Sequence, residues 1–356
     1  MNIAFLSFYS GMNNRGVERW VYDLASRLSE KHSITVYQNK PLKINVPYRV
    51  FPANLKYQEK DSLLLLERLF LDHKSVKVLQ FTLKVAIDLL KNNYDVIIPT
   101  DGGWEPAIVR IITWIRGSKM VIVGHAGIGC DDANNLWSFP NSFVALSSTA
   151  QKWANRVNPF VKTVYIPDGV DAGKFTRKGK RITLPFKNNY PIALCVGALE
   201  KGKRIDLAIK AVSRTESLNL LVCGRGELRE ELSELGNKLL GKRFELKQYD
   251  FDEIPAIYRS CDLLVSASLP QHSFEMVLLE AMATGLPVVA NDDPIRKEIV
   301  GNGGLLVDVT DISAFADIIK IALKKDWGDE PRLQSERFDW DVVVIKYEEL
   351  FNSLII

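Results

Sequence analysis

Residues 271–290 read QHSFEMVLLEAMATGLPVVA, and this stretch decides how the second half of the chain folds. The apolar run before it, DLLVSAS at residues 262–268, predicts a buried strand. From Ser273 the apolar residues recur at helical spacing until Gly285 and Pro287, which end a helix. The segment PVVA then predicts another buried strand. Strand, helix and strand in this order are the unit from which parallel α/β sheets are built.

The start of this helix is a predicted anion site. The Ser273 hydroxyl can cap the helix, and the first backbone N–H groups have no acceptor within it. These N–H groups and the helix dipole attract a phosphate. The residues expected to hold such a phosphate are Ser273, Phe274, Glu275, Met276 and Val277.

Glu280 lies about two turns into the helix, too far from its positive end to act as a cap. A carboxylate at this depth can accept hydrogen bonds from two neighbouring hydroxyl groups, such as those of a ribose. The alternative is that Glu280 faces solvent. Val277, Ala281 and Thr284 on its side of the helix argue only mildly against exposure, so the periodicity leaves both interpretations open.

The alternation of apolar strands and amphipathic helices runs along the whole chain. Strands are predicted at residues 2–8, 33–38, 94–100, 119–125, 143–147, 163–167, 191–197, 218–223, 244–248, 262–268, 287–290 and 304–307. Further helices are predicted near residues 15–31, 61–92, 104–116, 148–157, 203–214, 227–240, 252–259, 311–325 and 339–354. Buried strands separated by helices indicate parallel sheets that are covered on both faces.

The polar segment at residues 167–190 is rich in Gly and Pro, and we interpret it as a linker between two domains, which the length of 356 residues favours. The first predicted domain covers residues 1–170 and the second covers residues 171–338. The final helix, at 339–356, is predicted to pack back on the first domain. The predicted fold class is α/β, with two doubly wound Rossmann-like domains facing each other across a cleft. Open parallel sheets bind ligands at the carboxyl ends of their strands.

Composition excludes several classes of protein. The net charge is only +3, and no motif indicates nucleic-acid binding. No run of about 18 apolar residues is present, and a strand begins at residue 2, so we expect neither a membrane-spanning helix nor a signal peptide, and a cytoplasmic location. The cysteines lack metal-ligand spacing and are expected to be reduced thiols; they are Cys130, Cys195, Cys223 and Cys261.

Several loops carry candidate ligand residues. Lys203 and Arg204, in VGALEKGKR, follow a predicted strand and suit a diphosphate, although a solvated loop is equally consistent. Gly224 and Arg225 lie in a strand–turn–helix segment, LLVCGRGELREEL, that suits a phosphate or a nucleoside. A lone GxG is weak evidence for dinucleotide binding. Gly16 lies in a similar loop after the first strand.

Histidine and aspartate complete the candidates. His125 follows a buried strand in a glycine-rich loop and is the histidine best placed to meet a substrate, with His272 second. The pairs Asp131–Asp132 and Asp292–Asp293 could bind a divalent ion, but we interpret them as solvated loop residues and predict no metal site.

Together these motifs resemble the retaining glycosyltransferases of family 4, which have the two-domain GT-B fold. Their signature E-x-F-G-x-V-L-L-E-A-M-A-x-G-x-P-V-V-A is similar to HSFEMVLLEAMATGLPVVA. IPDGVDAGKF, VGALEKGKRIDLAIKA and LLVCGRGELREEL also resemble family segments and occur in the expected order. The resemblance covers nearly the whole chain and is strongest in the second half.

The resemblance implies an enzyme that moves a sugar from a UDP- or GDP-sugar to a glycan, lipid-linked or other hydroxyl acceptor, without a cofactor. It implies that Glu280 holds the donor ribose, that Lys203 binds the diphosphate and that the backbone of residues 274–277 holds the distal phosphate and the sugar. His125 would contact the transferred sugar, and Tyr249 lies where the nucleobase is expected. In the front-face mechanism usually proposed for such enzymes, a donor phosphate oxygen takes the acceptor proton, so neither a metal nor a protein nucleophile is required.

Three positions depart from the family pattern. His272 replaces the first signature glutamate, which touches hydroxyls of the transferred sugar, and it joins His125 and Glu280 as an expected catalytic residue. Ala198 replaces an arginine whose charge Arg204 is expected to supply. A carboxylate replaces the glycine after Phe274 and is expected to point toward the sugar. These departures keep two alternatives open: a degenerate member that binds a nucleotide or glycan without turnover, and a nucleotide-sugar epimerase.

Membrane contact is a further hypothesis. Residues 40–91 contain ten Lys or Arg against five Asp or Glu, together with the stretch LLLLERLFL. Such a segment suits an interfacial surface for a lipid-linked acceptor. A core-facing helix with a solvated basic face explains the same pattern and is slightly preferred.

Overall fold

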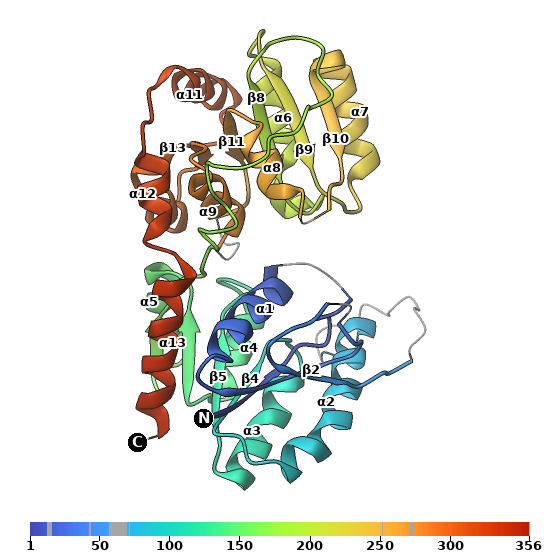
Figure 1. Ribbon diagram of the computed structural model, residues 1–356, viewed down its shortest axis with the longest axis vertical. Helices are drawn as coiled ribbons and strands as arrows, with labels where there is room; N and C mark the ends of the chain where they lie inside the picture. The colour runs from blue at the N-terminus through green and yellow to red at the C-terminus, as the bar shows by residue number, and fades with distance from the viewer. Residues whose placement is uncertain are drawn as a thin grey trace. The chain divides into compact units, whose positions relative to one another are not determined.

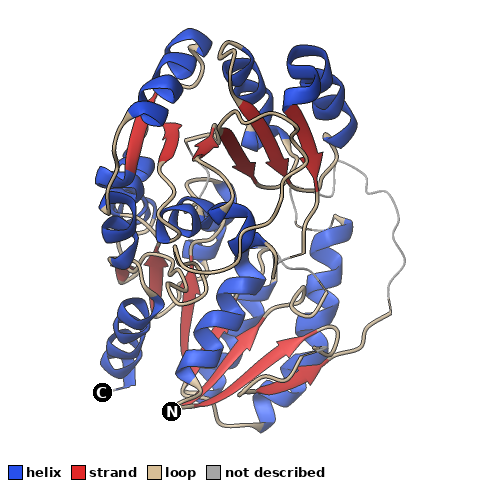
Figure 2. Cartoon of the chain, turned by 45° about the horizontal axis from the view of Figure 1, so that its top comes forward, coloured by secondary structure: helices blue, strands red, loops and turns tan. Residues whose placement is uncertain are grey.

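The computed structural model describes residues 1–12, 16–42, 44–56, 70, 72–250, 252–270 and 274–355. The chain forms two compact units: Met1–Asp168 with Asp341–Ile356, here called unit 1, and Gly169–Trp340, here called unit 2. Each contains one parallel sheet flanked by helices (Figures 1 and 2). In the part of the chain that is described, no helix is both long and apolar enough to cross a bilayer. The predictions for His272 and Ser273, and most of those for LLLLERLFL, lie outside the described residues.

Unit 1 is built on a seven-stranded sheet with the strand order β3-β2-β1-β4-β5-β6-β7. Its strands are β1 (Asn2–Leu6), β2 (Ser33–Gln38), β3 (Arg49–Pro52), β4 (Val96–Pro99), β5 (Lys119–Val123), β6 (Ser142–Ala145) and β7 (Thr163–Tyr165). Its helices are α1 (Gly16–Leu28), α2 (His73–Lys91), α3 (Glu105–Arg116), α4 (Cys130–Trp137), α5 (Ser148–Val157) and α13 (Trp340–Ile355). Ile3 of β1 pairs with Ile34 and Val96 on either side. All three are buried, as expected for a sheet covered on both faces.

Unit 2 is built on a six-stranded sheet with the strand order β10-β9-β8-β11-β12-β13. Its strands are β8 (Ile192–Val196), β9 (Asn219–Cys223), β10 (Phe244–Lys247), β11 (Leu263–Ser266), β12 (Val288–Asn291) and β13 (Gly304–Val307). Its α-helices are α6 (Ile205–Ser213), α7 (Arg229–Leu240), α8 (Ile254–Arg259), α9 (Met276–Ala283), α10 (Pro294–Val300), α11 (Ile312–Lys324) and α12 (Glu330–Glu336). Short 3-10 turns are η2 (Lys201–Lys203), η3 (Gly241–Arg243) and η4 (Gly301–Gly303).

Four elements were not predicted from the sequence: β3, α4, α10 and α12. β3 is a partly exposed edge strand that ends in Pro52, so it lacks the apolar run of the central strands. The three helices are only 8, 7 and 7 residues long, too short for a clear helical period.

The segment at residues 167–190, interpreted above as a linker, belongs to unit 2 from Gly169 onward. The N–H of Val170 donates to the carbonyl of Phe338 at 2.8 Å, and the Trp340 N–H donates to the Val170 carbonyl at 3.2 Å. Arg177 forms an ion pair with Asp329. The chain therefore passes from one unit to the other immediately before and after this ladder, at 168–169 and 340–341.

Helix α13 belongs to unit 1, although residue 340 ends unit 2 in sequence (Figure 1). Its Tyr347 and Phe351 are fully buried, and Glu348 lies 3.0 Å from the Nζ of Lys31. The four cysteines are free thiols, of which Cys130 is exposed and the other three are buried.

Candidate functional site

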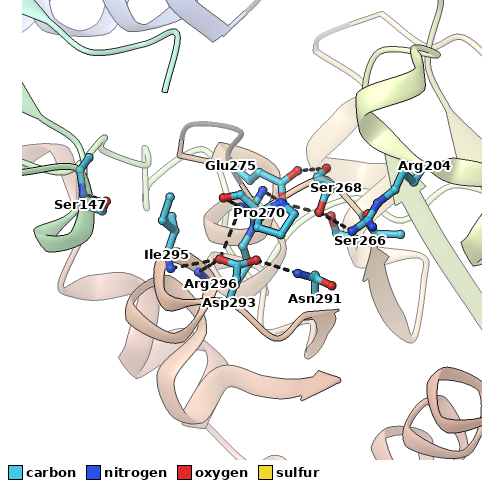
Figure 3. A network of polar contacts seen from close by, with 12 residues as sticks. Ser147, Arg204, Ser266, Ser268, Pro270, Glu275, Asn291, Asp293, Ile295 and Arg296 are labelled. Carbon is cyan, nitrogen blue, oxygen red and sulfur yellow. Dashed lines mark hydrogen bonds and ion pairs between the residues drawn. The ribbon is translucent and has the colours of Figure 1, made fainter. Parts of the chain in front are cut away.

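The strand order of unit 2 reverses between β8 and β11, because β9 follows β8 on one side and β11 lies on the other. The loops after two such strands run apart, and open parallel sheets bind ligands at this switch point. Polar side chains gather there from the ends of β8, β11 and β12 (Figure 3). We call them the switch-point cluster: Lys203, Arg204, Ser266, Ser268, Glu275, Asn291, Asp293 and Arg296.

Glu275 is the centre of the cluster, and its carboxylate is almost completely buried. It accepts hydrogen bonds from the Nζ of Lys203 at 3.2 Å, the Oγ of Ser266 at 3.1 Å, the Nε of Arg296 at 3.2 Å and the Oγ of Ser268. Burial on its own would raise the pKa of Glu275, but Lys203, Arg296 and Ser268 outweigh it and lower the pKa to about 2. The carboxylate is therefore ionised. It is turned into unit 2 toward these partners, which differs from the expectation that it points to a sugar.

Arg296 on α10 is fully buried and was missed by the sequence analysis. Its guanidinium lies 3.6 Å from Asp293 and donates to the carbonyl of Pro270 at 3.3 Å. Asp293 caps α10 by accepting from the backbone N–H groups of Ile295 at 3.1 Å and Arg296 at 3.0 Å. The Asp-Pro pair that begins α10 was a readable helix-start signal. The sequence did not show which side chain of α10 would be buried.

The interpretation of both aspartate pairs as solvated is wrong for one member of each. Asp293 is buried as the cap of α10, whereas Asp292 is exposed beside Lys297. In unit 1, the buried Asp132 accepts from the Gly127 N–H at 2.9 Å and from the Asn135 amide. Burial raises the pKa of Asp132 to about 7. Each buried carboxylate organises its own loop or helix start.

Arg204 adopts a left-handed backbone conformation with φ of 46°. Its Nε donates to the Ala267 carbonyl at 2.6 Å and its second guanidinium nitrogen to the Ser268 carbonyl at 3.0 Å. Arg204 thus ties the loop after β8 to the loop after β11. The adjacent Lys203 keeps 28% of its side chain exposed while it pairs with Glu275.

Helix α9 begins at Met276 and not near Ser273, and Glu275 is its N-cap residue without a side-chain cap bond. Phe274 precedes the helix with its ring buried 5.8 Å from that of Phe338. The first-turn N–H groups therefore come from Met276 and Val277, which have no acceptor within an α-helix. This helix start lies directly beside the Lys203–Glu275 pair in sequence and space.

Glu280 is half-buried and hydrogen-bonded. The Tyr258 hydroxyl on α8 donates to its Oε2 at 2.9 Å. Burial and the Glu280 carboxylate both raise the pKa of Tyr258 well above its ordinary value, so this hydroxyl keeps its proton. Tyr258 holds Glu280 in one orientation, a contact across two helices that helical spacing alone does not reveal.

The other candidates of unit 2 lie in the loops after β9 and β10. A Cβ on Gly224 would stand 2.0 Å from the carbonyl oxygen of Gly197, so this glycine permits close packing of two loops. Arg225 is exposed, and its carbonyl accepts from the Leu199 N–H at 2.9 Å. Tyr249 is half-buried, with the Nζ of Lys247 at 4.9 Å from its ring centroid.

Gly16 and His125 belong to unit 1. Gly16 is exposed at the first position of α1. His125 follows β5, with its ring 4.7 Å from that of Trp20. Burial lowers the pKa of His125 to about 3, so its imidazole is neutral at physiological pH. Its Nε2 is buried and has no hydrogen-bond partner among the described residues.

Residues 177–337 match the family model of glycosyl transferases group 1. The chain is 31% identical over 227 residues to a phosphatidyl-myo-inositol mannosyltransferase of Mycolicibacterium smegmatis, covering 59% of this chain and 57% of that protein. It is 29% identical over 216 residues to a D-inositol 3-phosphate glycosyltransferase of Corynebacterium urealyticum, covering 53% of this chain and 50% of that protein. The chain therefore spans between half and three fifths of the length of these relatives.

Solved structures are similar over the whole chain. Sucrose-phosphate synthase from Thermosynechococcus elongatus has a TM-score of 0.80 at 19% identity, with 99% of this chain and 98% of that chain covered. HepE from Anabaena, in complex with UDP-glucose, has a TM-score of 0.77 at 20% identity, with 99% and 100% covered. The prediction of a GT-B fold with two Rossmann-like domains is confirmed.

Proposed function

We propose that this chain is a retaining glycosyltransferase that transfers a sugar from a nucleotide-sugar donor to a hydroxyl acceptor. The observation that carries the proposal is the switch-point cluster, which places Lys203 beside the start of α9. The cluster lies within the residues that match glycosyl transferases group 1. Both named relatives are glycosyltransferases, and the HepE structure contains UDP-glucose, which supports a nucleotide-sugar donor for this chain as well.

In the proposed reaction, Lys203 and the N–H groups of Met276 and Val277 bind the donor diphosphate. They stabilise the charge that develops on the leaving nucleoside diphosphate. Glu275 holds the Lys203 ammonium at 3.2 Å before a donor arrives, so the cation is positioned in advance. Arg204 orders the two loops that frame the site through its carbonyl contacts.

Glu280 is proposed to hold the donor ribose, with Tyr258 fixing its carboxylate. His125 and His272 are proposed to contact the transferred sugar. A neutral imidazole donates or accepts one hydrogen bond without adding charge, and burial keeps His125 in that form. The acceptor proton goes to a donor phosphate oxygen, so no metal, cofactor or protein nucleophile takes part in the proposed mechanism.

A panel of UDP- and GDP-sugars tests the donor, with nucleoside diphosphate release and calorimetry as readouts. We expect Lys203→Ala and Glu280→Ala each to weaken donor binding about tenfold or more, since hydrogen bonds to charged groups contribute about 1.5–3 kcal/mol. Lys210→Ala is the matched control, because this lysine is 43% exposed and its ion pair among the described residues is with Asp206 of the same helix, α6. Absence of binding to every nucleotide would refute the proposal. Binding without transfer or hydrolysis would favour the degenerate alternative, and an epimerised donor would favour the epimerase.

We also propose a cytoplasmic location with peripheral contact to an anionic lipid surface, which suits a lipid-linked acceptor. Apolar side chains are exposed along one side each of α2 and α3, two helices packed against each other. We call this the α2–α3 face: Leu83, Ile87, Leu90, Ile111, Trp114 and Ile115. Trp114 is 66% exposed and Ile87 62%. An exposed apolar patch of this kind marks an interaction surface.

The charges around the α2–α3 face favour lipid over protein. Lys84, Lys91 and Arg116 are exposed on the two helices. Both acidic residues of these helices are engaged, since Asp88 accepts from the Tyr37 hydroxyl and Glu105 is fully buried. Basic residues around aromatic and aliphatic side chains suit the interface of an anionic bilayer, where each Lys or Arg contributes about 1 kcal/mol.

Sedimentation with phosphatidylglycerol vesicles at low salt tests this contact. The wild type should sediment with these vesicles and not with phosphatidylcholine vesicles, and Ile87→Glu with Trp114→Glu should release it. Phe160→Glu, at a residue that is 84% exposed outside the face, is the control and should still bind. If the protein stays in the supernatant, or binds both kinds of vesicle equally, the proposed contact with an anionic lipid surface is contradicted. A dimer abolished by the double variant would assign the face to a second copy.

A further inference from the structure

Four polar residues of unit 1, three of them buried and His125 half-buried, come together although they are far apart in sequence. We call them the Trp20 cluster: Trp20 on α1, His125 after β5, Asp168, and Tyr347 on α13. Trp20 and Tyr347 are 0% exposed and Asp168 is 3% exposed. Each of the four has a buried polar atom without a hydrogen-bond partner among the described residues: the Nε1 of Trp20, the Nε2 of His125, the Oδ1 of Asp168 and the hydroxyl of Tyr347. Buried polar atoms are nearly always hydrogen-bonded, so such exceptions call for a functional explanation.

Trp20 connects the members of this cluster. Its ring lies 4.7 Å from the His125 ring, 5.9 Å from the Tyr347 ring and 6.0 Å from the Phe5 ring, each in an edge-to-face arrangement. Pairs of this geometry contribute about 0.5–1.5 kcal/mol each beyond the area they bury. The Trp20 contact therefore restrains the plane of an imidazole whose Nε2 has no described hydrogen bond to restrain it.

Tyr347 and Asp168 come from the two separate segments of the chain that make up unit 1. Burial and the Asp168 carboxyl raise the pKa of the Tyr347 hydroxyl well above its ordinary value, while the Trp20 indole acts in the opposite direction. The hydroxyl is thus within electrostatic reach of both groups. Asp168 ends the first segment of unit 1, and Tyr347 lies in the segment that returns to it. The Trp20 cluster consequently joins His125 to both of these segments.

We propose that Trp20 is a positioning residue for His125 and that Tyr347 holds Trp20 in place, so that the C-terminal helix completes the surroundings of His125. The inference rests on the proposed function, in which His125 contacts the transferred sugar. A sugar hydroxyl would supply the partner that Nε2 lacks. Loss of the Tyr347 ring or of the indole allows the imidazole to turn, and a displacement of about 1 Å at a reacting centre lowers turnover by up to about 100-fold.

Imidazole NMR tests the positioning without any donor. The chain has four histidines, so the His125 ring signals can be assigned by comparison with His125→Gln. We expect Trp20→Phe and Tyr347→Leu, which removes the ring that contacts Trp20, to shift the His125 signals while those of His32 and His73 stay in place. Trp153→Phe, at a partly buried tryptophan of α5 in the same unit, is the control and should leave His125 unchanged.

Turnover provides the second measurement. Both variants should lower kcat for the preferred donor about 10- to 100-fold with a smaller change in KM, since His125 is misplaced and not removed. Tyr347→Leu leaves the indole itself in place, so it serves if Trp20→Phe does not fold. Unchanged His125 signals in Tyr347→Leu, or shifted signals with full kcat, would overturn the inference. A wild type that shows the NMR coupling but transfers no sugar would instead overturn the proposed function.

Discussion

Replacing Glu275 by Gln should strongly destabilise unit 2, because it removes the buried carboxylate that neutralises Lys203 and Arg296. The pKa of Glu275 falls from the ordinary value of 4.5 to about 2. A difference of about 2.5 units, at 1.36 kcal/mol per unit, corresponds to about 3 kcal/mol at pH 7. The Glu275 side chain is only 2% exposed, so solvent does not screen the interaction. Breaking one side of a buried ion pair generally costs about 3–5 kcal/mol, which agrees.

The direction of the pH dependence follows from the lowered pKa. The stabilisation is fully present above pH 4.5 and is lost as the pH falls toward 2, because over this range the unfolded state binds a proton that the folded state does not. Urea unfolding, followed by tryptophan fluorescence and circular dichroism, should therefore show a gap of about 3 kcal/mol between wild type and Glu275→Gln at pH 7. The gap should narrow at acidic pH.

The control is Glu336→Gln, the same chemical change in an exposed pair of unit 2, where Glu336 is 49% exposed beside Arg332. It should lower the free energy of unfolding by less than about 1 kcal/mol. If Glu275→Gln and Glu336→Gln prove equally stable, or if the Glu275→Gln gap does not change with pH, the assignment of Glu275 as the counter-ion of Lys203 and Arg296 is incorrect.

Three further substitutions test the surroundings of the switch-point cluster. Gly224→Ala should destabilise by about 1–3 kcal/mol in urea unfolding, because its Cβ would meet the Gly197 carbonyl at 2.0 Å; an unchanged midpoint would contradict the close packing. Asp293→Ala removes the cap of α10 and should lower the free energy of unfolding by about 1–2 kcal/mol, whereas Asp293→Asn should keep part of the cap and lose less. Tyr258→Phe should weaken donor binding about tenfold in calorimetry, since Glu280 loses its 2.9 Å hydrogen bond; equal affinity would show that Tyr258 does not orient Glu280.

The sequence by itself determined the two doubly wound sheets and the order of their main strands. Apolar runs such as IALCV and NLLVC can be recognised from the sequence alone, because a strand that is buried on both faces consists mostly of apolar residues. The same local signals marked Lys203 and the α9 segment as candidate ligand sites. They missed β3 at the sheet edge and placed the start of α9 near Ser273, since partial exposure and cap geometry leave only weak patterns.

Tertiary structure decided which charges meet. Lys203, Glu275 and Arg296 follow three different strands, β8, β11 and β12, and only the placing of these strands side by side in the sheet brings the three side chains together. The contact of the His125 ring with Trp20, and of Trp20 with Tyr347 on the C-terminal helix, likewise depends on segments that are more than a hundred residues apart in sequence. Periodicity reports which face of an element is apolar. It does not show which distant side chain will pair with a buried charge. Only the tertiary fold determines that pairing.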